Sequence, residues 1–470
     1  MPKKDYKKIE KELTFAKRNC WDVWSEAEQK KALAFSEGYK DFLNKAKTER
    51  EAVLAGVEIL KKKGFKSIEE LKSLKAGDKF YAVNRGKGLV AGVIGKKIFD
   101  EGFRLIMSHI DSPRLDAKVM PLYEDEKLAF LKTHYYGGIK KYHWPTIQLA
   151  LHGFVALKNG KQVSFIIGED DNDPIFMITD LLPHLARRQM EKTLDKAIAA
   201  EELNILIGSI PVVDKTIKER VKLAILEHLN TKYGMIEEDF YSAEIEAVPA
   251  AKARDLGFDR SMVAAYGQDD RVCAYGSFDS LLTAKATNQT QIIYWVDKEE
   301  VGSEGLTGAI SNYFEVTISR LLKLVGKPNG FSEVHELFSR SMGLSSDVTA
   351  GYDPDYKDVH DPLNAARLGF GVALERHTGH RGKSSTSEAN ADYVQKIRTI
   401  LNKAGVIWQS AGLGKVDEGG GGTIAMFMAA RNLEIIDIGV PLFNMHAPME
   451  IASKADIYST YLAYKAFFEN

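Results

Sequence analysis

The sequence predicts an α/β protein in which helices sandwich a mixed, mostly parallel sheet, with a β-rich domain inserted into it. Two observations support this fold class. Apolar runs typical of buried strands alternate with amphipathic helical patterns towards both ends of the chain, and such alternation is typical of helix-covered parallel sheets. Between about residues 116 and 259 the pattern changes to short strands, turns and charged helices. We therefore expect a discontinuous domain formed by residues 1–115 and 260–470, and an inserted domain formed by residues 116–259.

The expected elements follow in chain order. Residues 5–74 have amphipathic helical patterns rich in Lys, Glu and Ala. Strands are expected at FYAVNR, GLVAGVIG and FRLIMSHI, and the insertion continues with the strand pair LALHGFVALKNGKQVSFIIG. After residue 260, strands at QIIYWVD, FGVALERH, VIWQSA and LEIIDIGVP alternate with helices at DYVQKIRTILNKAG and TIAMFMAARN. This order predicts a second run of α/β units that completes the sheet begun before the insertion.

Composition and charge exclude several classes of protein. The chain has 470 residues, 44% of them hydrophobic and 27% charged, as expected of a soluble protein with more than one domain. Lysine and arginine number 64 against 65 acidic residues, a net charge of −1, so nucleic-acid and anionic-membrane partners are not expected. The amino-terminal stretch MPKKDYKKIEKEL lacks the apolar core of a secretory signal, and no run is long enough to span a bilayer.

Cysteine usage limits both the compartment and the metal chemistry. Only Cys20 and Cys273 are present, so a disulfide framework is excluded, and a cytoplasmic location is the simplest expectation. Any bound metal must then be held by His, Asp and Glu.

The stretch YWVDKEEVGSEG places acidic residues directly after a buried strand. Glu299 and Glu300 are adjacent, with Asp297 and Glu304 close by. Like charges repel and desolvation adds to their cost, so this arrangement indicates a bound cation or two carboxylates with different uses. The alternative is that the paired glutamates begin a solvated helix, where the helix dipole favours them.

Four further segments carry similar residues, and the strand ends of an open α/β sheet, where ligands bind, would bring such segments together. They are SHIDSP (His109, Asp111), YGQDDRVC (Asp269, Asp270), GLSSDVTAG (Asp347) and FNMHAPME (His446, Glu450). Two histidines and several carboxylates suit a pair of divalent ions such as zinc, cobalt or manganese, bridged by one carboxylate. Three of these segments also have a structural alternative: a chance HxD tripeptide, a surface salt bridge at DDR, or an aspartate (Asp347) that caps a turn.

The adjacent glutamates could then divide two tasks. In a loop beyond the strand, one can bind metal while the other reaches a water molecule as general base. In HxD, the side chains at i and i+2 share one face of an extended chain, so Asp111 can accept the second ring proton of His109.

Taken in order, the segments resemble the aspartyl aminopeptidase family of two-metal exopeptidases, which have a zinc exopeptidase fold. The resemblance covers nearly the whole chain and is carried by SHIDSPRLDAK, QDDRVCAYGSF, VDKEEVGSEG, SSDVTAGYDP, EGGGGTIAMFMAARNLEIIDIGVP and NMHAPMEIASKAD. It implies an enzyme that releases single residues from peptides with a free amino terminus. It also implies a homo-oligomer, in which dimers joined through the inserted domain build a tetrahedral dodecamer.

The resemblance also implies roles for individual residues. The metal ligands would be His109, Asp269, Glu300, Asp347 and His446, with Asp269 as the bridge. Glu299 would be the general base, Asp111 the partner that orients His109, and His184 in LLPHLARR a residue that enters the active site of a neighbouring subunit. The chain has QDDR where many members have an apolar residue followed by Asp-Asn, so Asp269 and Asp270 stay alternatives for the bridge.

Substrate preference is a separate question. The family resemblance implies acidic first residues (Asp/Glu) or neutral ones such as Leu. Acidic recognition requires a desolvated cation, for which Arg381 and Lys383 in RHTGHRGKSS are candidates. The backbone N–H groups of Gly421 and Gly422, in the cluster EGGGG, could hold a substrate carbonyl. Two other functions compete: a two-metal amidohydrolase acting on acylated amino acids or carboxyl ends, and a metal-binding scaffold without catalysis.

Overall fold

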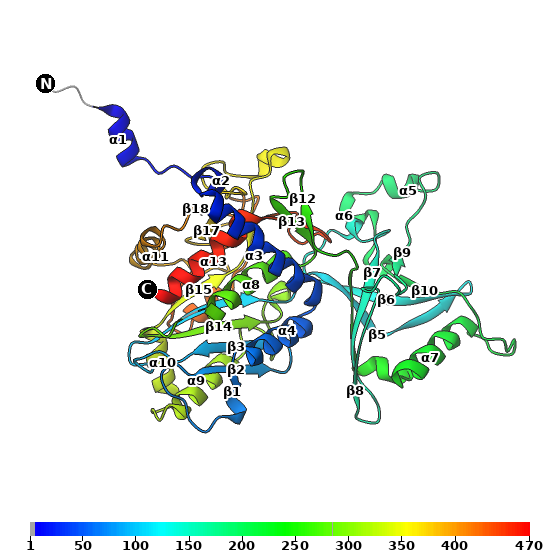
Figure 1. Cartoon of the computed structure of the whole chain (residues 1–470). Coiled ribbons are helices and arrows are strands. Elements are labelled where there is room, and N and C mark those ends of the chain that lie inside the picture. The colour runs from blue at the N-terminus through cyan, green and yellow to red at the C-terminus, as the bar shows by residue number, and fades with distance from the viewer. Residues whose placement is uncertain (1–4, 284) are drawn as a thin grey trace.

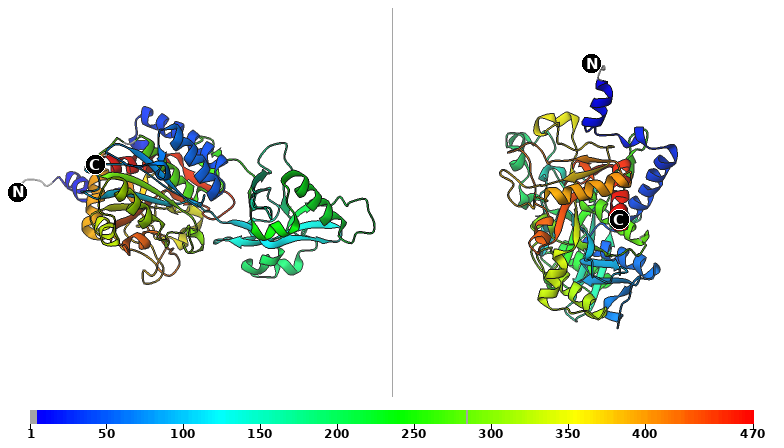
Figure 2. Two further views of the ribbon diagram at one scale, coloured as in Figure 1. Left: turned by 90° about the horizontal axis from the view of Figure 1, so that it is seen from below. Right: turned by 90° about the vertical axis from the view of Figure 1, so that its left-hand side faces the viewer.

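The computed structural model describes residues 5–283 and 285–470, which form two lobes joined by a narrow connection (Figures 1 and 2). The larger lobe contains a nine-stranded sheet and a five-stranded sheet, and the smaller lobe contains a seven-stranded sheet. The helices of the larger lobe are α1 (Tyr6–Leu13), α2 (Cys20–Val23), α3 (Glu26–Lys45), α4 (Glu49–Lys62), α8 (Gln268–Thr283), α9 (Tyr313–Leu324), α10 (Phe331–Ser339), α11 (Ala391–Lys403), α12 (Ala425–Ala429) and α13 (Lys454–Glu469).

The nine-stranded sheet is mixed and has a parallel centre. In spatial order its strands are β1 (Lys66–Ser67), β2 (Lys79–Asn84), β3 (Gly88–Val93), β14 (Thr290–Val296), β4 (Phe103–His109), β15 (Met342–Ser346), β19 (Glu434–Gly439), β17 (Val372–Glu375) and β18 (Trp408–Ser410). The four central strands β14, β4, β15 and β19 are parallel, while β3 and β17 run antiparallel to them. The predicted α/β fold class, with a mostly parallel sheet between helices, is confirmed.

Alternation along β14 shows how the sheet is covered on both faces. All seven residues of this strand are buried. Trp295 packs with Phe42 of α3 and Phe278 of α8, and belongs to the core beneath α3, α4, α8, α11 and α13. Tyr294 points the other way and stacks on Phe314 of α9, in the core beneath α9, α10 and α12. A strand buried on both faces explains the continuous apolar run in the sequence.

The smaller lobe is an antiparallel sheet with helices against it. Its strands, in spatial order, are β8 (Gln162–Ile167), β7 (Leu149–Ala156), β11 (Ala243–Pro249), β5 (Arg114–Asp125), β6 (Leu128–Tyr136), β10 (Ile205–Gly208) and β9 (Met177–Ile178), and its helices are α5 (Arg187–Met190), α6 (Leu194–Ala197) and α7 (Arg220–Tyr233). Glu126 and Lys127 both have positive φ, which gives the tight turn between β5 and β6. Partly buried apolar residues of α7, such as Ile225 and Leu229, pack against the buried residues that form the core of this lobe.

The five-stranded sheet contains β12 (Arg254–Leu256), β13 (Met262–Ala265), β21 (Glu450–Ser453), β20 (Pro441–Phe443) and β16 (Thr349–Ala350). Residues 254–256 fall inside the stretch 116–259, yet they pair with β13 of the larger lobe. The seven-stranded sheet itself extends from Arg114 to Pro249. That these sheets correspond to separately folding domains stays a prediction.

Buried ion pairs join the lobes. Glu49 of α4 is fully buried and contacts Lys87 at 2.9 Å and Arg114 of β5 at 3.3 Å. Arg114 also contacts Glu246 of β11 at 3.2 Å. Burial would raise the pKa of Glu49, but the two cations hold it below the usual value. Removing one partner of such a buried pair would leave a charge without compensation, so each of these residues depends on the others at the junction of the lobes.

Two sequence expectations differ from the observed elements. The expected helical region 5–74 contains α1 to α4, but residues 66–70 form β1 and a short 3-10 turn. Strand β15 was not expected, because its sequence MGLSS has a glycine and serines in place of the β-branched residues typical of strands. In residues 5–283 and 285–470, no helix combines the length and apolar character that crossing a bilayer requires.

Candidate active site

The carboxyl ends of three parallel strands bring the predicted residues to one edge of the nine-stranded sheet. His109 is the last residue of β4, and it lies beside Val296, the last residue of β14. Glu299 and Glu300 form a 3-10 turn just beyond β14, and Asp347 follows β15. His446 approaches from the loop between β20 and β21 of the five-stranded sheet.

Asp269 lies at the centre of the cluster. Its Oδ1 is 3.1 Å from His109 Nε2, and its Oδ2 is 3.2 Å from His446 Nε2. On one side, His109 Nε2 is 3.6 Å from Asp347 Oδ1, and on the other, His446 Nε2 is 3.4 Å from Glu300 Oε2. The cluster therefore consists of two groups of side chains that share one carboxylate.

Backbone carbonyl groups determine which ring nitrogen of each histidine faces the cluster. His109 Nδ1 is 3.0 Å from the carbonyl oxygen of Asp111, and His446 Nδ1 is 2.9 Å from the carbonyl oxygen of Gly138. A carbonyl oxygen only accepts, so each Nδ1 carries the proton. The lone pair of each neutral imidazole is then on Nε2, the atom that faces the carboxylates, as a metal ligand requires.

Asp111 explains why two adjacent glutamates follow β14. Its Oδ1 accepts the backbone N–H of Glu299 and its Oδ2 accepts that of Glu300, each at 3.2 Å. Lys298 before them has a φ of +70°, which turns the chain sharply after the strand. The two side chains then differ in exposure, because 21% of the Glu299 side chain but only 2% of Glu300 is accessible to solvent. Glu299 can meet a substrate or water, while Glu300 points inwards.

Glu450, the first residue of β21, supports the cluster from the opposite side. Its Oε1 accepts the backbone N–H of His446 at 2.8 Å, and its Oε2 accepts that of Asp269 at 3.1 Å. One buried carboxylate thus fixes the backbone of a central aspartate and of a histidine that lies far away in the sequence. Burial raises the pKa of Glu450 to about 8, and nearby Asp269 adds to the increase.

Asp270 differs from its neighbour. Its side chain is fully buried, and neither of its oxygens has a hydrogen-bond partner within the described ranges. It can form a three-residue group with His109 and Asp347, but the shared position between the two histidines belongs to Asp269.

Burial and neighbouring carboxylates together raise the pKa values of His109, His446 and Glu299. Burial opposes a charge on His109, yet the carboxylates of Asp347 and Asp111 outweigh burial and raise the pKa of the imidazole. Burial likewise opposes a charge on His446, but Asp269 and Glu300 raise its pKa to about 11. Burial also raises the pKa of Glu299 to about 8, with His109 opposing the increase. The raised pKa values of the histidines and of Glu299 both mean that the site favours added positive charge, either as protons or as cations.

The residues fit divalent metal ions. Three groups of residues could each hold a metal ion, because the potential ligand atoms within each group lie within 4.8 Å of one another. The groups are His109 with Glu299 and Glu300, His109 with Asp270 and Asp347, and Asp269 with Glu300 and His446. Glu300 Oε1 is buried and has no hydrogen-bond partner among the described residues, as a ligand atom would. Imidazole nitrogens and carboxylate oxygens are ligands that zinc accepts.

Comparison with known proteins identifies the family. Residues 42–468 match the family described as "Aminopeptidase I zinc metalloprotease (M18)". The chain belongs to the M18 family. The match confirms the predicted metallo-aminopeptidase, a hydrolase acting on peptide bonds, and it disfavours the amidohydrolase and the silent scaffold.

Individual M18 relatives agree with this assignment. A curated relative from Clostridium acetobutylicum, "Probable M18 family aminopeptidase 1", is 51% identical over 457 residues, which cover 96% of this chain and 98% of the relative. The crystal structure of an M18 aminopeptidase from Thermotoga maritima superposes with a TM-score of 0.93 at 44% identity, covering 97% of this chain and all of that one. The mApe1 dodecamer of S. cerevisiae, at 19% identity and a TM-score of 0.72 over 93% of this chain and 96% of that one, shares the fold.

Some predicted site residues of this M18 enzyme lie outside the cluster. In residues 5–283 and 285–470, its ion pairs and hydrogen bonds do not include His184, Arg381, Lys383, Gly421 or Gly422. His184 is exposed in the turn before α5 of the smaller lobe. Arg381 and Lys383 are exposed, and Lys383 pairs with Glu388 at 3.0 Å.

The glycine cluster and the basic loop are neighbours in space. The carbonyl oxygen of Gly421 accepts the backbone N–H of Gly379 at 2.7 Å. A Cβ at Gly420 would lie 2.3 Å from the carbonyl oxygen of Gly379, so the close approach requires glycine there. Residues 379–384 and 419–422 therefore form one composite surface.

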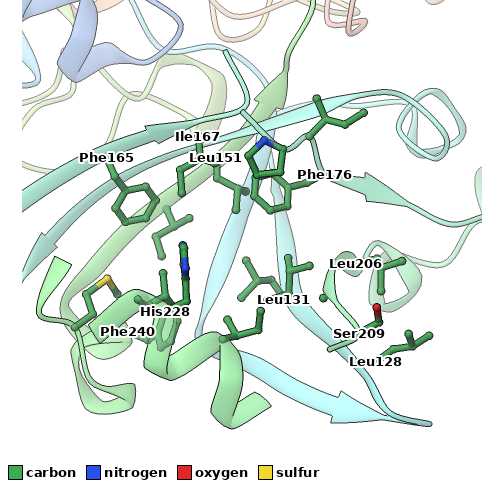
Figure 3. Close-up of a pocket in the computed structure, with 18 residues that line it drawn as sticks. Leu128, Leu131, Leu151, Phe165, Ile167, Phe176, Leu206, Ser209, His228 and Phe240 are labelled. Atoms are coloured by element: carbon green, nitrogen blue, oxygen red, sulfur yellow. The ribbon is translucent and has the colours of Figure 1, made fainter. Parts of the chain in front are cut away.

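A large cavity lies elsewhere, in the smaller lobe. It measures about 510 Å³ and is lined by apolar side chains such as Leu131, Leu151 and Phe165, with His228 and Ser209 among its few polar residues (Figure 3). None of the clustered carboxylates or histidines lines it. The clustered polar residues at the sheet edge and this apolar cavity are therefore separate features of the molecule.

Two hydrogen bonds to the cluster were not predicted from the sequence motifs. Tyr136 donates a hydrogen bond to Asp111 Oδ2 at 2.8 Å, and Gly138 binds His446 as described. The only sequence signal is the segment HYYGGIKKYHW, whose glycines look like those of an ordinary turn.

Proposed function

We propose that this chain is a two-zinc aminopeptidase in which Asp269 bridges the metals. His109 and Asp347 would hold one ion, and Glu300 and His446 the other. The observation that carries this proposal is the position of Asp269, whose two oxygens lie 3.1 Å and 3.2 Å from the two imidazoles. The donor set also accepts cobalt or manganese. The family description names zinc, which makes zinc the first choice.

Each residue has a defined task in the proposed reaction. When bound, zinc supplies a Lewis acid that polarises a carbonyl and makes water more acidic. Glu299 takes a proton from the attacking water and later gives it to the nitrogen of the leaving amine. Asp111 keeps the Glu299 backbone and the His109 ring in place. The free amino terminus of the substrate would meet a carboxylate of the cluster that is not used for metal binding.

We further propose that the first residue of the substrate contacts the composite surface of residues 379–384 and 419–422. Gly421 and Gly422 would offer backbone N–H groups to a substrate carbonyl. Arg381 and Lys383 would serve acidic side chains, but both are exposed and Lys383 is already paired with Glu388. An exposed, paired cation gives a carboxylate little net attraction. We therefore expect neutral first residues such as leucine to be cleaved at least as well as aspartate or glutamate.

The proposed function is tested with chromogenic aminoacyl substrates carrying Asp, Glu, Leu or Lys, together with an acetyl-blocked leucine control. Metal-stripped protein should be inactive, and added zinc should restore cleavage of the substrates with a free amine only. Cleavage of the blocked compound would indicate the amidohydrolase instead. Zinc binding without any turnover would indicate the scaffold. A ratio of Asp to Leu cleavage well above one would assign Arg381 and Lys383 to acidic recognition.

The oligomer is proposed on different grounds. The mApe1 protein of S. cerevisiae, which shares this fold, forms a dodecamer, and His184 of this chain is exposed in the smaller lobe, where it could reach a neighbouring subunit. We propose dimers that build a tetrahedral dodecamer with His184 acting in trans. His184→Phe should then lower kcat by roughly 100-fold while the melting temperature stays unchanged, since an exposed side chain contributes little to stability.

The control for His184→Phe is His228→Phe, a change in the same lobe at the apolar cavity. Light scattering of both proteins should give the same particle mass. An unchanged kcat in the His184 variant would remove the trans-subunit role.

The location is part of the same proposal. Cys20 and Cys273 are both free and buried, which supports a reducing, cytoplasmic location.

A further inference from the structure

Tyr136, the last residue of β6, reaches the cluster from the smaller lobe. Its hydroxyl donates to Asp111 Oδ2 at 2.8 Å, the same oxygen that accepts the Glu300 backbone N–H. The guanidinium of Arg114 lies 4.1 Å above its ring and holds the ring in place. Burial raises the pKa of Tyr136, so its hydroxyl stays a donor.

Gly137 packs directly against a predicted ligand. Its φ is +73°, and a Cβ there would lie 3.2 Å from Cβ of Glu300 and 3.3 Å from Oε2 of Glu300. The third neighbour is Pro113, 3.3 Å from the same point. A side chain at this position would approach Glu300 more closely than an ordinary contact allows, so Glu300 would have to shift by a few tenths of an ångström.

Gly138, the next residue, contacts His446. Its carbonyl oxygen accepts the proton on His446 Nδ1, which leaves Nε2 free to face Asp269 and Glu300. Three successive residues, the last of β6 and the two glycines that follow it, thus lie against three separate members of the cluster: Asp111, Glu300 and His446.

We propose that the segment Tyr136–Gly138 is a positioning segment through which the smaller lobe sets the geometry of the metal centre. It rests on the proposed function, since it assigns Glu300 and His446 as ligands. The segment touches neither substrate nor reacting atoms. It acts by orienting Asp111, by limiting the space around Glu300 and by fixing the tautomer of His446. Partners of this kind typically change metal affinity or activity by about 10- to 100-fold when they are removed.

Two substitutions in the full chain test the proposal, each with a matched control. Gly137→Ala is compared with Gly160→Ala, because Gly160 also has a positive φ, +84°, but a Cβ there meets nothing within 4 Å. Both changes place alanine at a positive φ, so contact with Glu300 and Pro113, which Gly160 lacks, distinguishes them. Tyr136→Phe is compared with Tyr135→Phe, which alters an adjacent tyrosine that is 41% exposed.

Three quantities are measured: zinc affinity by competition with a chelator, the melting temperature of the metal-free protein, and kcat and KM on the best substrate of the panel. For Gly137→Ala we expect zinc affinity to fall by roughly 10- to 100-fold relative to Gly160→Ala, with similar metal-free melting temperatures. For Tyr136→Phe we expect kcat to fall by about the same factor with KM nearly unchanged, while Tyr135→Phe behaves as the unmodified protein.

The outcomes separate this proposal from the proposed function. Zinc affinity and kcat in both test variants equal to those in their controls would overturn the positioning role. Equal losses in Gly137→Ala and Gly160→Ala would also overturn it, because backbone strain alone would then explain the effect. Absence of zinc-dependent turnover in the unmodified protein would instead remove the proposed function, and the zinc affinities would still decide whether the segment positions the ligands.

Discussion

Replacing Glu299 by glutamine is expected to lower kcat by roughly 10²- to 10⁴-fold while the protein keeps its zinc. Glutamine has nearly the same shape but cannot take up the proton of the attacking water. The exposure of the Glu299 side chain, 21% against 2% for Glu300, places it where water and substrate can reach it. Steady-state kinetics and the zinc content of the purified variant check this expectation.

The matched control is Glu304→Gln, which changes an exposed acid just beyond the same turn. It should retain both zinc and turnover. Near-normal activity of Glu299→Gln would remove the general-base role. Loss of zinc from that variant would show that Glu299 is a ligand, as its place in one of the three ligand groups also allows.

Asp269→Asn should lose bound zinc and at least about 100-fold in kcat/KM, the second large effect that we expect. The substitution keeps the size of the side chain but turns one of its two acceptor oxygens into an NH₂ group. Because each oxygen of Asp269 faces a different imidazole, both halves of the centre should be affected. Zinc content and kcat/KM are measured on the same preparation.

Asp270→Asn is the natural comparison, since it makes the identical chemical change one residue away. We expect a loss of less than about tenfold, because Asp270 does not bridge the two histidines. The opposite result, with Asp270→Asn losing zinc and Asp269→Asn retaining it, would move the bridge to Asp270. The two variants together resolve an ambiguity that the motif QDDR leaves open.

The central strands β4, β14 and β19 could be predicted because they are buried on both faces and rich in apolar residues, whereas the central strand β15 lacks such residues and could not. The run TQIIYWV identified β14, and the polar residues directly after it and after β4 marked the edge where the cluster lies. The five-stranded sheet could not be predicted, since short strands such as β16 and β20 depend on partners far along the chain.

The hydrogen bonds that support the clustered residues also could not be predicted from the sequence. The hydrogen bonds from the Glu299 and Glu300 backbone to Asp111 depend on the turn at Lys298, whose positive φ no motif specifies. Glu450 stood out beside His446 in FNMHAPME, but its contact with the Asp269 backbone follows only from how β21 meets α8. A sequence indicates which groups are present more readily than which backbone groups they hold.

The wide separation of the clustered residues along the chain has a consequence for biosynthesis. His446 meets Gly138 across 308 residues, and Glu450 meets Asp269 across 181. Chains are made from the amino terminus onwards, so a nascent chain on the ribosome lacks the β20–β21 hairpin until residues 441–453 have been synthesised. Until then, Glu300 lacks the histidine that faces it, and Asp269 has no Glu450 carboxylate to hold its backbone. The clustered residues can therefore come together only after this hairpin has docked beside α8.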